Sequence, residues 1–138
     1  MTANPVVVAA QRTLADAHEL MREHGIRHLP VVEGPRLVGL VSQRDLYLIE
    51  TLRGVDATAA PVAEAMNAEP YAVAPDAPLE EVAREMAAHK YGSAVVVQRG
   101  EVVGIFTTVD ALRALASALR RGRPAAPQRP PPNASERP

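Results

Sequence analysis

The sequence contains the same pattern of residues twice, and this internal repeat constrains the fold more than any other feature. A shift of 65 positions aligns residues 1–45 with residues 66–110 without a gap, and 13 of the 45 aligned pairs are identical. Most of the remaining apolar positions stay apolar in both copies. Self-similarity over such a span is the sequence signature of a duplicated structural unit. We therefore expect the chain to fold as two copies of one unit.

Each copy predicts the same order of secondary-structure elements. A short strand, at 6–8 or 71–73, precedes a helix whose apolar residues recur at intervals of three and four. Two β-branched apolar runs with glycine in the connection then predict a buried hairpin. A last helix follows, over about 45–52 in the first copy and 110–119 in the second. Each unit is thus predicted to be β-α-β-β-α, and the fold class is α/β (α+β).

We divide the chain into two repeats and a tail. The first repeat is expected to cover residues 1–58 and the second residues 59–119. Residues 120–138 hold five arginines and six of the 13 prolines, a composition typical of disordered segments. Because a unit as small as one repeat is only marginally stable alone, we expect the two repeats to pack as a pseudo-symmetric pair that shares one core.

Composition argues against several functional classes. The chain has no cysteine, which fits a reducing cytoplasm, and no apolar run near the ~20 residues needed to cross a bilayer, so we predict a cytoplasmic protein without membrane contact. Residues 1–119 carry ten basic and fifteen acidic residues, which does not favour nucleic-acid binding. His24 and His28 are four residues apart, but Gly25 lies between them and no carboxylate sits at a supporting spacing. No nucleophile–base pair is visible. We expect no metal site, no required cofactor and no enzymatic activity.

A seven-residue motif ends the predicted hairpin in each copy. It is GLVSQRD at Gly39–Asp45 and GIFTTVD at Gly104–Asp110. A hydroxyl residue followed three positions later by an acid is the pattern of a capping box, so Ser42 and Thr107 can begin helices with no ligand involved. The same pattern occurs at 13–16, where nothing indicates a site. The motif alone leaves two interpretations open, a helix cap and a ligand site.

Three features favour the ligand site. A glycine at the strand end lets another group approach the backbone. The helix that follows offers N–H groups and the positive end of its dipole to an anion. Finally, the motif occurs in two units that should pack symmetrically, which places both strand-to-helix junctions around a shared cleft. At each junction an ionised aspartate, Asp45 or Asp110, can accept hydrogen bonds from both hydroxyls of a ribose.

The order, spacing and doubling of these segments resemble a tandem pair of cystathionine-β-synthase-type (CBS) domains, also called a Bateman module. The resemblance spans about residues 1–119 and is carried by 24–46, 62–86 and 89–112. It implies a regulatory module that binds an adenosine-type nucleotide such as AMP, ADP or ATP between the repeats, with S-adenosylmethionine a less favoured candidate. It also implies a homodimer formed through helices, and an unidentified effector protein that the module modulates.

The resemblance assigns roles to individual residues. The acid that ends each motif would hold the ribose hydroxyls, here Asp45 and Asp110 with Ser42 and Thr107 beside them. The base would contact residues near the first strand and before the hairpin, which are Val7, Ile26, Pro30, Ala72, Tyr91 and Val95. The phosphates would meet basic residues before the hairpin and inside the first motif, which are Arg27, His28 and Arg44.

The two half-sites are unequal in charge. The second copy has Gly92 and Ser93 where the first has Arg27 and His28. We therefore expect at most one good nucleotide pocket, in which residues of the first copy bind the phosphates. We expect this pocket to bind a nucleotide with micromolar affinity. The alternative is a ligand-free protein-interaction or dimerisation module in which both motifs are only helix caps.

Overall fold

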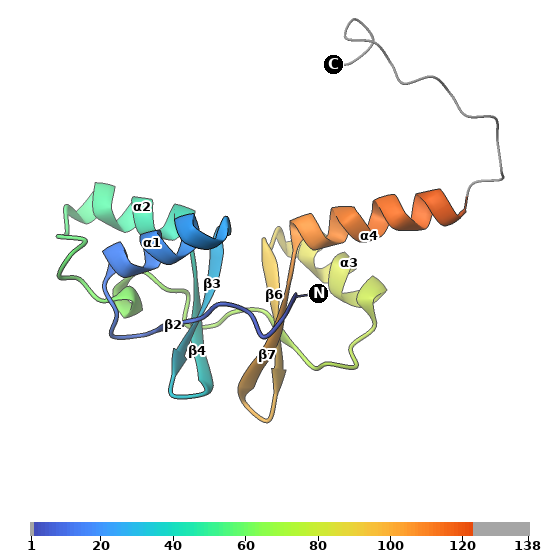
Figure 1. Ribbon diagram of the computed structural model, residues 1–138, viewed down its shortest axis with the longest axis horizontal. Coiled ribbons are helices and arrows are strands. Elements are labelled where there is room, and N and C mark those ends of the chain that lie inside the picture. The colour runs from blue at the N-terminus through green and yellow to red at the C-terminus, as the bar shows by residue number, and fades with distance from the viewer. Residues whose placement is uncertain (1, 123–138) are drawn as a thin grey trace, which may run out of the picture.

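Each half of the chain folds as the predicted β-α-β-β-α unit (Figure 1). A computed structural model describes residues 2–122, so residues 123–138 of the predicted disordered tail lie outside the described residues. The first repeat consists of β2 (Val8–Ala9), α1 (Leu14–His24), β3 (His28–Glu33), β4 (Arg36–Ser42) and α2 (Gln43–Arg53). The second consists of β5 (Ala72–Val73), α3 (Leu79–His89), β6 (Ser93–Gln98), β7 (Glu101–Thr107) and α4 (Thr108–Arg121). Two further elements are β1 (Thr2–Ala3), which the sequence did not predict, and a short 3-10 helix, η1 (Val62–Glu64).

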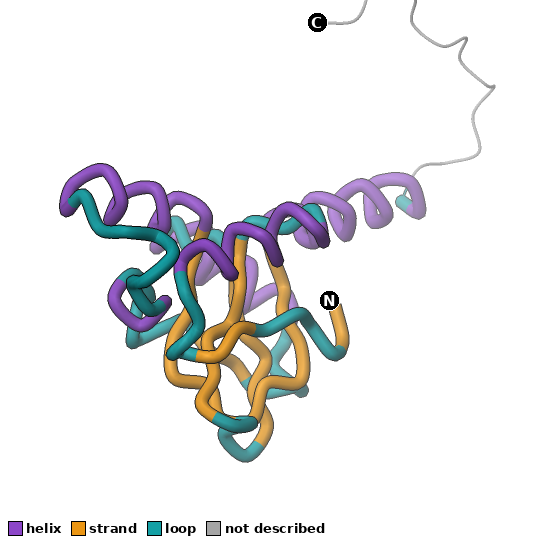
Figure 2. Tube along the Cα trace, turned by 60° about the vertical axis from the view of Figure 1, so that its left-hand side comes forward, coloured by secondary structure: helices purple, strands orange, loops and turns teal. Residues whose placement is uncertain are grey.

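The strands form one sheet in the order β2-β3-β4-β7-β6-β5, with β1 added to β7. The two hairpins are antiparallel and join each other through the pair Arg36 and Glu101. Each hairpin has a register shift, between Val31 and Val32 in the first and between Val96 and Val97 in the second. These positions are 65 residues apart, so the repeat persists in the hydrogen-bonding pattern. The hairpin turns point away from the helices, and Figure 2 shows the strands gathered below them.

Three helices begin with a complete capping box, as the sequence predicted. Thr13, Ser42 and Thr107 each accept a hydrogen bond from the backbone N–H three residues later, and the acid at that position accepts one from the cap N–H. Helices α2 and α4 begin two residues before the predicted starts. The reason is that the aspartate of a capping box is the third residue of its helix, whereas the prediction placed it first.

Buried side chains form two clusters, one in each repeat, so the prediction of a single shared core is wrong. The first contains Leu14, Met21, Leu29, Val41 and Leu46, among others. The second is smaller and contains Val82, Met86, Ala94 and Phe106. Each repeat packs its helices on its own hairpin, which separates the clusters. Ala60 and Val62, which the predicted boundary assigns to the second repeat, pack in the first cluster; the boundary itself stays a prediction.

The two repeats are held together by exchanged backbone segments. Asn67, in the segment that leads into the second repeat, pairs with Leu40 of β4 in the first through hydrogen bonds of 2.8 and 3.0 Å. In the opposite direction, Thr2 of β1 lies across from Ile105 of β7. These two pairs are related by the same 65-residue shift. Each repeat therefore completes its strand pairing with the leading segment of the other, and the chain from β1 onward starts beside the second repeat (Figure 1).

The glycine of the first motif makes this crossing possible. A Cβ atom added to Gly39 would lie 2.9 Å from the backbone oxygen of Asn67 and 2.5 Å from the sulfur of Met66. Both distances are too short for real contacts. The sequence indicated that a missing side chain here admits another group, and that group is the backbone of the other repeat.

We predict that Gly39→Ala lowers the free energy of unfolding by about 1–3 kcal/mol, since the new methyl group must push the crossing backbone away. Urea unfolding followed by circular dichroism measures this change. Gly122→Ala is the matched control, because a Cβ there would meet its nearest neighbour, the oxygen of Ala118, at an ordinary 3.4 Å. Equal stability of the two variants would show that the crossing tolerates a side chain at Gly39.

Candidate ligand-binding cleft

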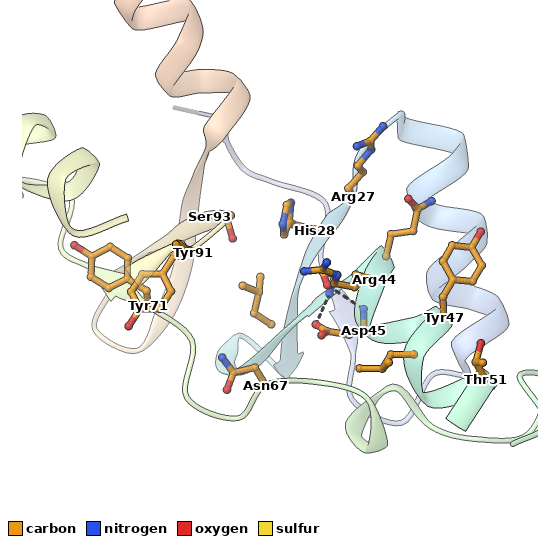
Figure 3. Close-up of a pocket in the computed structure, with 16 residues that line it drawn as sticks. Arg27, His28, Arg44, Asp45, Tyr47, Thr51, Asn67, Tyr71, Tyr91 and Ser93 are labelled. Carbon is orange, nitrogen blue, oxygen red and sulfur yellow. Dashed lines mark hydrogen bonds between the residues drawn. The ribbon is translucent and has the colours of Figure 1, made fainter. Parts of the chain in front are cut away.

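A cleft of about 930 Å³ opens between the two repeats (Figure 3). The first repeat lines it with the residues that enter β3, with Leu40 and Ser42 of β4, and with one face of α2 from Gln43 to Thr51. The second lines it with Asn67 and Tyr71 from its leading segment and with residues 90–93 from the loop that enters β6. Its volume falls within the ~300–1,000 Å³ typical of small-molecule sites. The exchange of segments thus creates a pocket that neither repeat could form alone.

The structure brings six of the thirteen predicted site residues to this cleft. They are Arg27, His28, Ser42, Arg44, Asp45 and Tyr91. Thr107 and Asp110 lie at the start of α4, at the pseudo-equivalent junction. Ile26 lines a neighbouring hollow, Pro30 and Val95 are buried within their strands, and Val7 and Ala72 are exposed outside the cleft. Ligand contact by any of the thirteen residues stays a prediction.

Asp45 divides its carboxylate between the helix cap and the cleft. Its Oδ2 atom accepts a hydrogen bond of 2.9 Å from the backbone N–H of Ser42. Among the described residues, its Oδ1 atom has no hydrogen-bond partner. One carboxylate can therefore complete the cap and still present an acceptor to a ligand, so the two interpretations of the motif are compatible.

The start of α2 offers fewer open N–H groups than the sequence indicated. The N–H of Gln43 already donates to the backbone oxygen of Arg27 at 2.9 Å. The N–H of Asp45 donates to Ser42 Oγ at 3.1 Å. Two of the first three N–H groups of the helix are thus occupied by the protein. An anion in the cleft would depend on side-chain cations more than on the helix end.

Positively charged side chains line the cleft. Among the described residues that line it, Arg27, Arg44 and Lys90 carry positive charge, and Asp45 is the one acidic residue. Sequence reasoning missed Lys90. It ends α3 in the left-handed conformation, with φ of 59°, where the first repeat has Gly25 with φ of 62°. The sequence did carry a signal for Lys90, because it aligns with the glycine that ends the helix of the first repeat. Non-glycine residues held in this conformation concentrate at functional sites.

Aromatic rings form a wall at the side that the second repeat supplies. The rings of Tyr71 and Tyr91 stack with centroids 5.1 Å apart, and His89 stacks on Tyr91 at the same distance. Tyr71 was also missed as a site residue, although the predicted strand begins with it. Figure 3 shows both tyrosines on the opposite side of the cleft from Arg27 and Arg44. The second repeat therefore supplies the stacked tyrosines and Lys90 to the cleft, and the first repeat supplies Arg27 and Arg44.

His28 fills the space that Gly92 leaves open across the repeat interface. A Cβ atom on Gly92 would lie 2.6 Å from His28 Nε2, so the imidazole rests against the glycine. The bulky His28 of one repeat thus faces the small Gly92 of the other. Burial lowers the pKa of His28 below its ordinary value of 6.5; Arg27 lowers it further, and Asp45 opposes the shift. His28 is therefore mainly neutral at pH 7.

This depressed pKa predicts a pH dependence of folding stability. The unfolded chain binds more protons than the folded one at pH values between the folded pKa and 6.5, so the contribution of neutral His28 is complete above 6.5 and is lost as the pH falls. We predict that His28→Gln flattens the decline in melting temperature between pH 7 and pH 5, measured by scanning calorimetry. His24→Gln, at the exposed end of α1, is the control. Identical pH profiles for wild type and His28→Gln would contradict the assignment.

No three His, Asp or Glu side chains of residues 2–122 lie close enough together to hold a metal ion. The contact of 2.6 Å between His18 and Glu50 joins α1 to α2 beside the neighbouring hollow. None of the described helices is both long enough and apolar enough to span a bilayer.

The chain resembles known proteins along most of its length. The family model of the CBS domain matches residues 1–49 and 62–117. An inosine-5'-monophosphate dehydrogenase of Korarchaeum cryptofilum is 35% identical over 106 residues, which are 76% of this chain but 21% of that enzyme. The chain therefore spans about a fifth of this relative.

Two solved structures show the likeness in three dimensions. A Vibrio cholerae protein assigned as the acetoin utilization protein AcuB superposes with a TM-score of 0.80 and 36% identity, covering 90% of this chain and 94% of that one. The structure of CBSX2 in complex with AMP has a TM-score of 0.73 and 30% identity, covering 87% and 95%. With a family model that matches both halves and with the same fold in these relatives, the chain belongs to the CBS-domain family as a tandem pair.

Proposed function

We propose that this CBS pair is a regulatory module that binds one adenosine-type nucleotide, of the AMP, ADP or ATP class, in the cleft at Asp45. The observation that carries the proposal is the arrangement around the Asp45 carboxylate. Its Oδ1 atom has no partner among the described residues, and the cleft it lines has stacked tyrosines on one side and Arg27 and Arg44 on the other. The AMP bound to CBSX2, a structural relative at 30% identity, supports this ligand class.

The side chains that line the cleft offer a contact to each of the three parts of a nucleotide: ribose, base and phosphates. Asp45 would accept hydrogen bonds from the ribose hydroxyls, because an ionised carboxylate offers only acceptors. The base would lie toward the wall of Tyr71 and Tyr91, where a flat ring can contact the aromatic side chains. The phosphates would then point toward Arg27 and Arg44, which supply charge-assisted hydrogen bonds.

The junction at Asp110 is a poorer candidate for the same ligand. Asp110 Oδ2 accepts hydrogen bonds from both the backbone N–H and the hydroxyl of Thr107, at 2.9 and 3.2 Å, so that hydroxyl is already committed to the cap. The second motif also carries Val109 where the first carries Arg44. We therefore propose one nucleotide per chain, held by the first motif.

We predict that Asp45→Asn weakens the binding of AMP and ATP at least tenfold, because the carboxylate that holds the ribose is lost. Isothermal titration calorimetry with AMP, ADP, ATP and S-adenosylmethionine measures the affinities. Asp16→Asn is the matched control: Asp16 completes an identical capping box on α1, outside the cleft. Both substitutions should lower stability by about 0.5–1 kcal/mol, but Asp16→Asn should leave binding unchanged.

The outcomes separate nucleotide binding from a purely structural role. If the wild type gives no heat with any of these ligands at millimolar concentration, the motifs are helix caps alone and the interaction-module alternative stands. If Asp110→Asn abolishes binding while Asp45→Asn does not, the ligand occupies the other junction.

We also propose that the module forms a homodimer through α2 and α4. Leu112, Leu115 and Leu119 form an exposed stripe on α4, a helix with no buried residue among those described. On α2, Leu48 and Leu52 are exposed in the same manner. The internal repeat relates these two helices, so one module presents two similar apolar faces. A surface of this kind suits the self-complementary contact of a two-fold dimer.

The cleft and this proposed interface share residues of α2. Tyr47 and Leu48 line the cleft and are also more than half exposed. A nucleotide bound at Asp45 would therefore contact the same helix that meets a second copy or an effector protein. This gives the module a direct way to change its interaction surface when the ligand is bound.

We predict that the double substitution Leu112→Gln and Leu115→Gln shifts the protein from dimer to monomer, since it removes apolar area from the centre of the α4 stripe. Sedimentation equilibrium measures the dissociation constant, which should rise at least tenfold. Leu79→Gln is the control, because Leu79 is half-exposed on α3 and outside this surface. A wild-type protein that sediments as a monomer, or a double variant that remains dimeric, would contradict the proposed interface.

A further inference from the structure

Leu14 and Leu79 hold equivalent positions in the two repeats, but their burial differs. Each is the first residue of its helix, α1 or α3, and they lie 65 positions apart. Leu14 is 0% exposed in the first cluster, whereas Leu79 is 50% exposed. The described part of the second repeat therefore lacks whatever covers this leucine in the first.

The segment that follows α2 covers Leu14. Ala60 and Val62 of this segment belong to the same buried cluster as Leu14. The backbone oxygen of Ala60 accepts a hydrogen bond of 3.0 Å from the N–H of Leu14, and that of Ala57 accepts one of 2.8 Å from Ala15. Helix N-termini leave such N–H groups without partners inside the helix. One segment thus buries the leucine and also caps the first two N–H groups of α1.

The start of α3 has neither the cover nor these caps. Within residues 2–122, the N–H groups of Leu79 and Glu80 donate no hydrogen bond. The cap residue of α3 is Pro78, whose side chain makes no capping hydrogen bond. The corresponding segment of this repeat would follow α4, and beyond Gly122 it lies outside the described residues.

The sequence beyond α4 repeats part of the segment that covers Leu14. Ala59–Ala60–Pro61 recurs 66 positions later as Ala125–Ala126–Pro127. The position of Val62 is taken by Gln128. The tail can therefore supply the small side chain and the backbone oxygen that Ala60 supplies, but with less apolar contact than in the first repeat.

Charge and position favour the same contact. Residues 120–129 contain four arginines and no acid, and the first turn of α3 carries Glu80 and Glu81. In Figure 1 the end of α4 and the start of α3 both lie on the side of the second repeat that faces away from the first. Four residues lead from Gly122 to Ala126 and span about 13 Å when extended. The contact thus requires a direct path from α4 to α3.

We propose that residues 125–127 cover Leu79 of the same chain and cap α3, as residues 59–61 do for α1. In this arrangement the methyl group of Ala126 contacts Leu79, and the backbone oxygen of Ala126 accepts a hydrogen bond from the Leu79 N–H. The arginines on either side of the triplet face the two acids of the first turn. The contact lies outside the cleft, so it goes beyond the proposed nucleotide function and does not depend on it.

A spin label on the tail tests this contact in the full-length protein without nucleotide. The sequence contains no cysteine, so Gln128→Cys provides a single attachment site. 1H–15N NMR spectra then measure which amide signals the label broadens. We expect broadening at Leu79 and Glu80, and little at the equivalent Leu14, whose cover the first repeat supplies itself.

Hydrogen exchange in unlabelled protein provides a second measurement, with Ala126→Gln and Ala134→Gln as a matched pair. Both substitutions place the same larger side chain in the tail, but Ala134 lies outside the repeated triplet. We expect Ala126→Gln to speed exchange of the Leu79 and Glu80 amides at least about fivefold, because the cover is lost. Ala134→Gln should exchange as the wild type does.

Three results would overturn the assignment. One is an absence of broadening at the start of α3. Another is equal exchange at Leu79 and Glu80 in the two variants. The third is broadening in a mixture of 15N-labelled chains without the spin label and spin-labelled chains without 15N, which would mean that the tail docks on a second copy. A failure of AMP to bind the cleft would leave all three measurements unaffected.

Discussion

The fold and the cleft both depend on the backbone crossing at Gly39. There the segment that leads into the second repeat pairs with β4 of the first through Asn67 and Leu40, at a distance that no side chain on Gly39 would allow. Because each repeat has its own buried cluster, the link between them comes from this exchange, from the matching pair at β1 and β7, and from the pair of Arg36 and Glu101 that joins the hairpins. It also places Asn67 and Tyr71 of one repeat opposite Asp45 of the other, which is what makes the cleft.

The motif at Gly39–Asp45 caps α2 and leaves an acceptor free, because the two oxygens of one carboxylate are used differently. The cap of α2 uses one oxygen of Asp45, and the other oxygen stays open to the cleft. The pseudo-equivalent Asp110 also receives the hydroxyl of Thr107, which ties it more completely to its own helix. Together with the exchange of Arg27–His28 for Gly92–Ser93, this small difference makes the two junctions unequal although their backbones repeat closely.

Much of this could be predicted from the sequence, because the repeat, the apolar periodicity and the capping boxes are local patterns. They gave the order of the elements and the three helix starts to within two residues. Features that depend on contacts between residues far apart in the sequence could not be predicted this way: the pairing of β1 with β7, the separate clusters, and the stacking of Tyr71 on Tyr91. For the same reason Pro30 and Val95, assigned to the base pocket by alignment with a family pattern, lie buried within strands, while Lys90 and Ser93 reach the cleft.

We infer that an adenosine nucleotide occupies the cleft at the first motif. Amide chemical shifts in 1H–15N NMR spectra, recorded during a titration with AMP, test it most directly because they locate the ligand residue by residue. We expect saturable shifts concentrated at Arg44 and Asp45 on α2 and at Tyr91–Ser93 in the second repeat, with little change at Asp110. Spectra that stay unchanged up to millimolar AMP, or shifts centred on the start of α4, would contradict it.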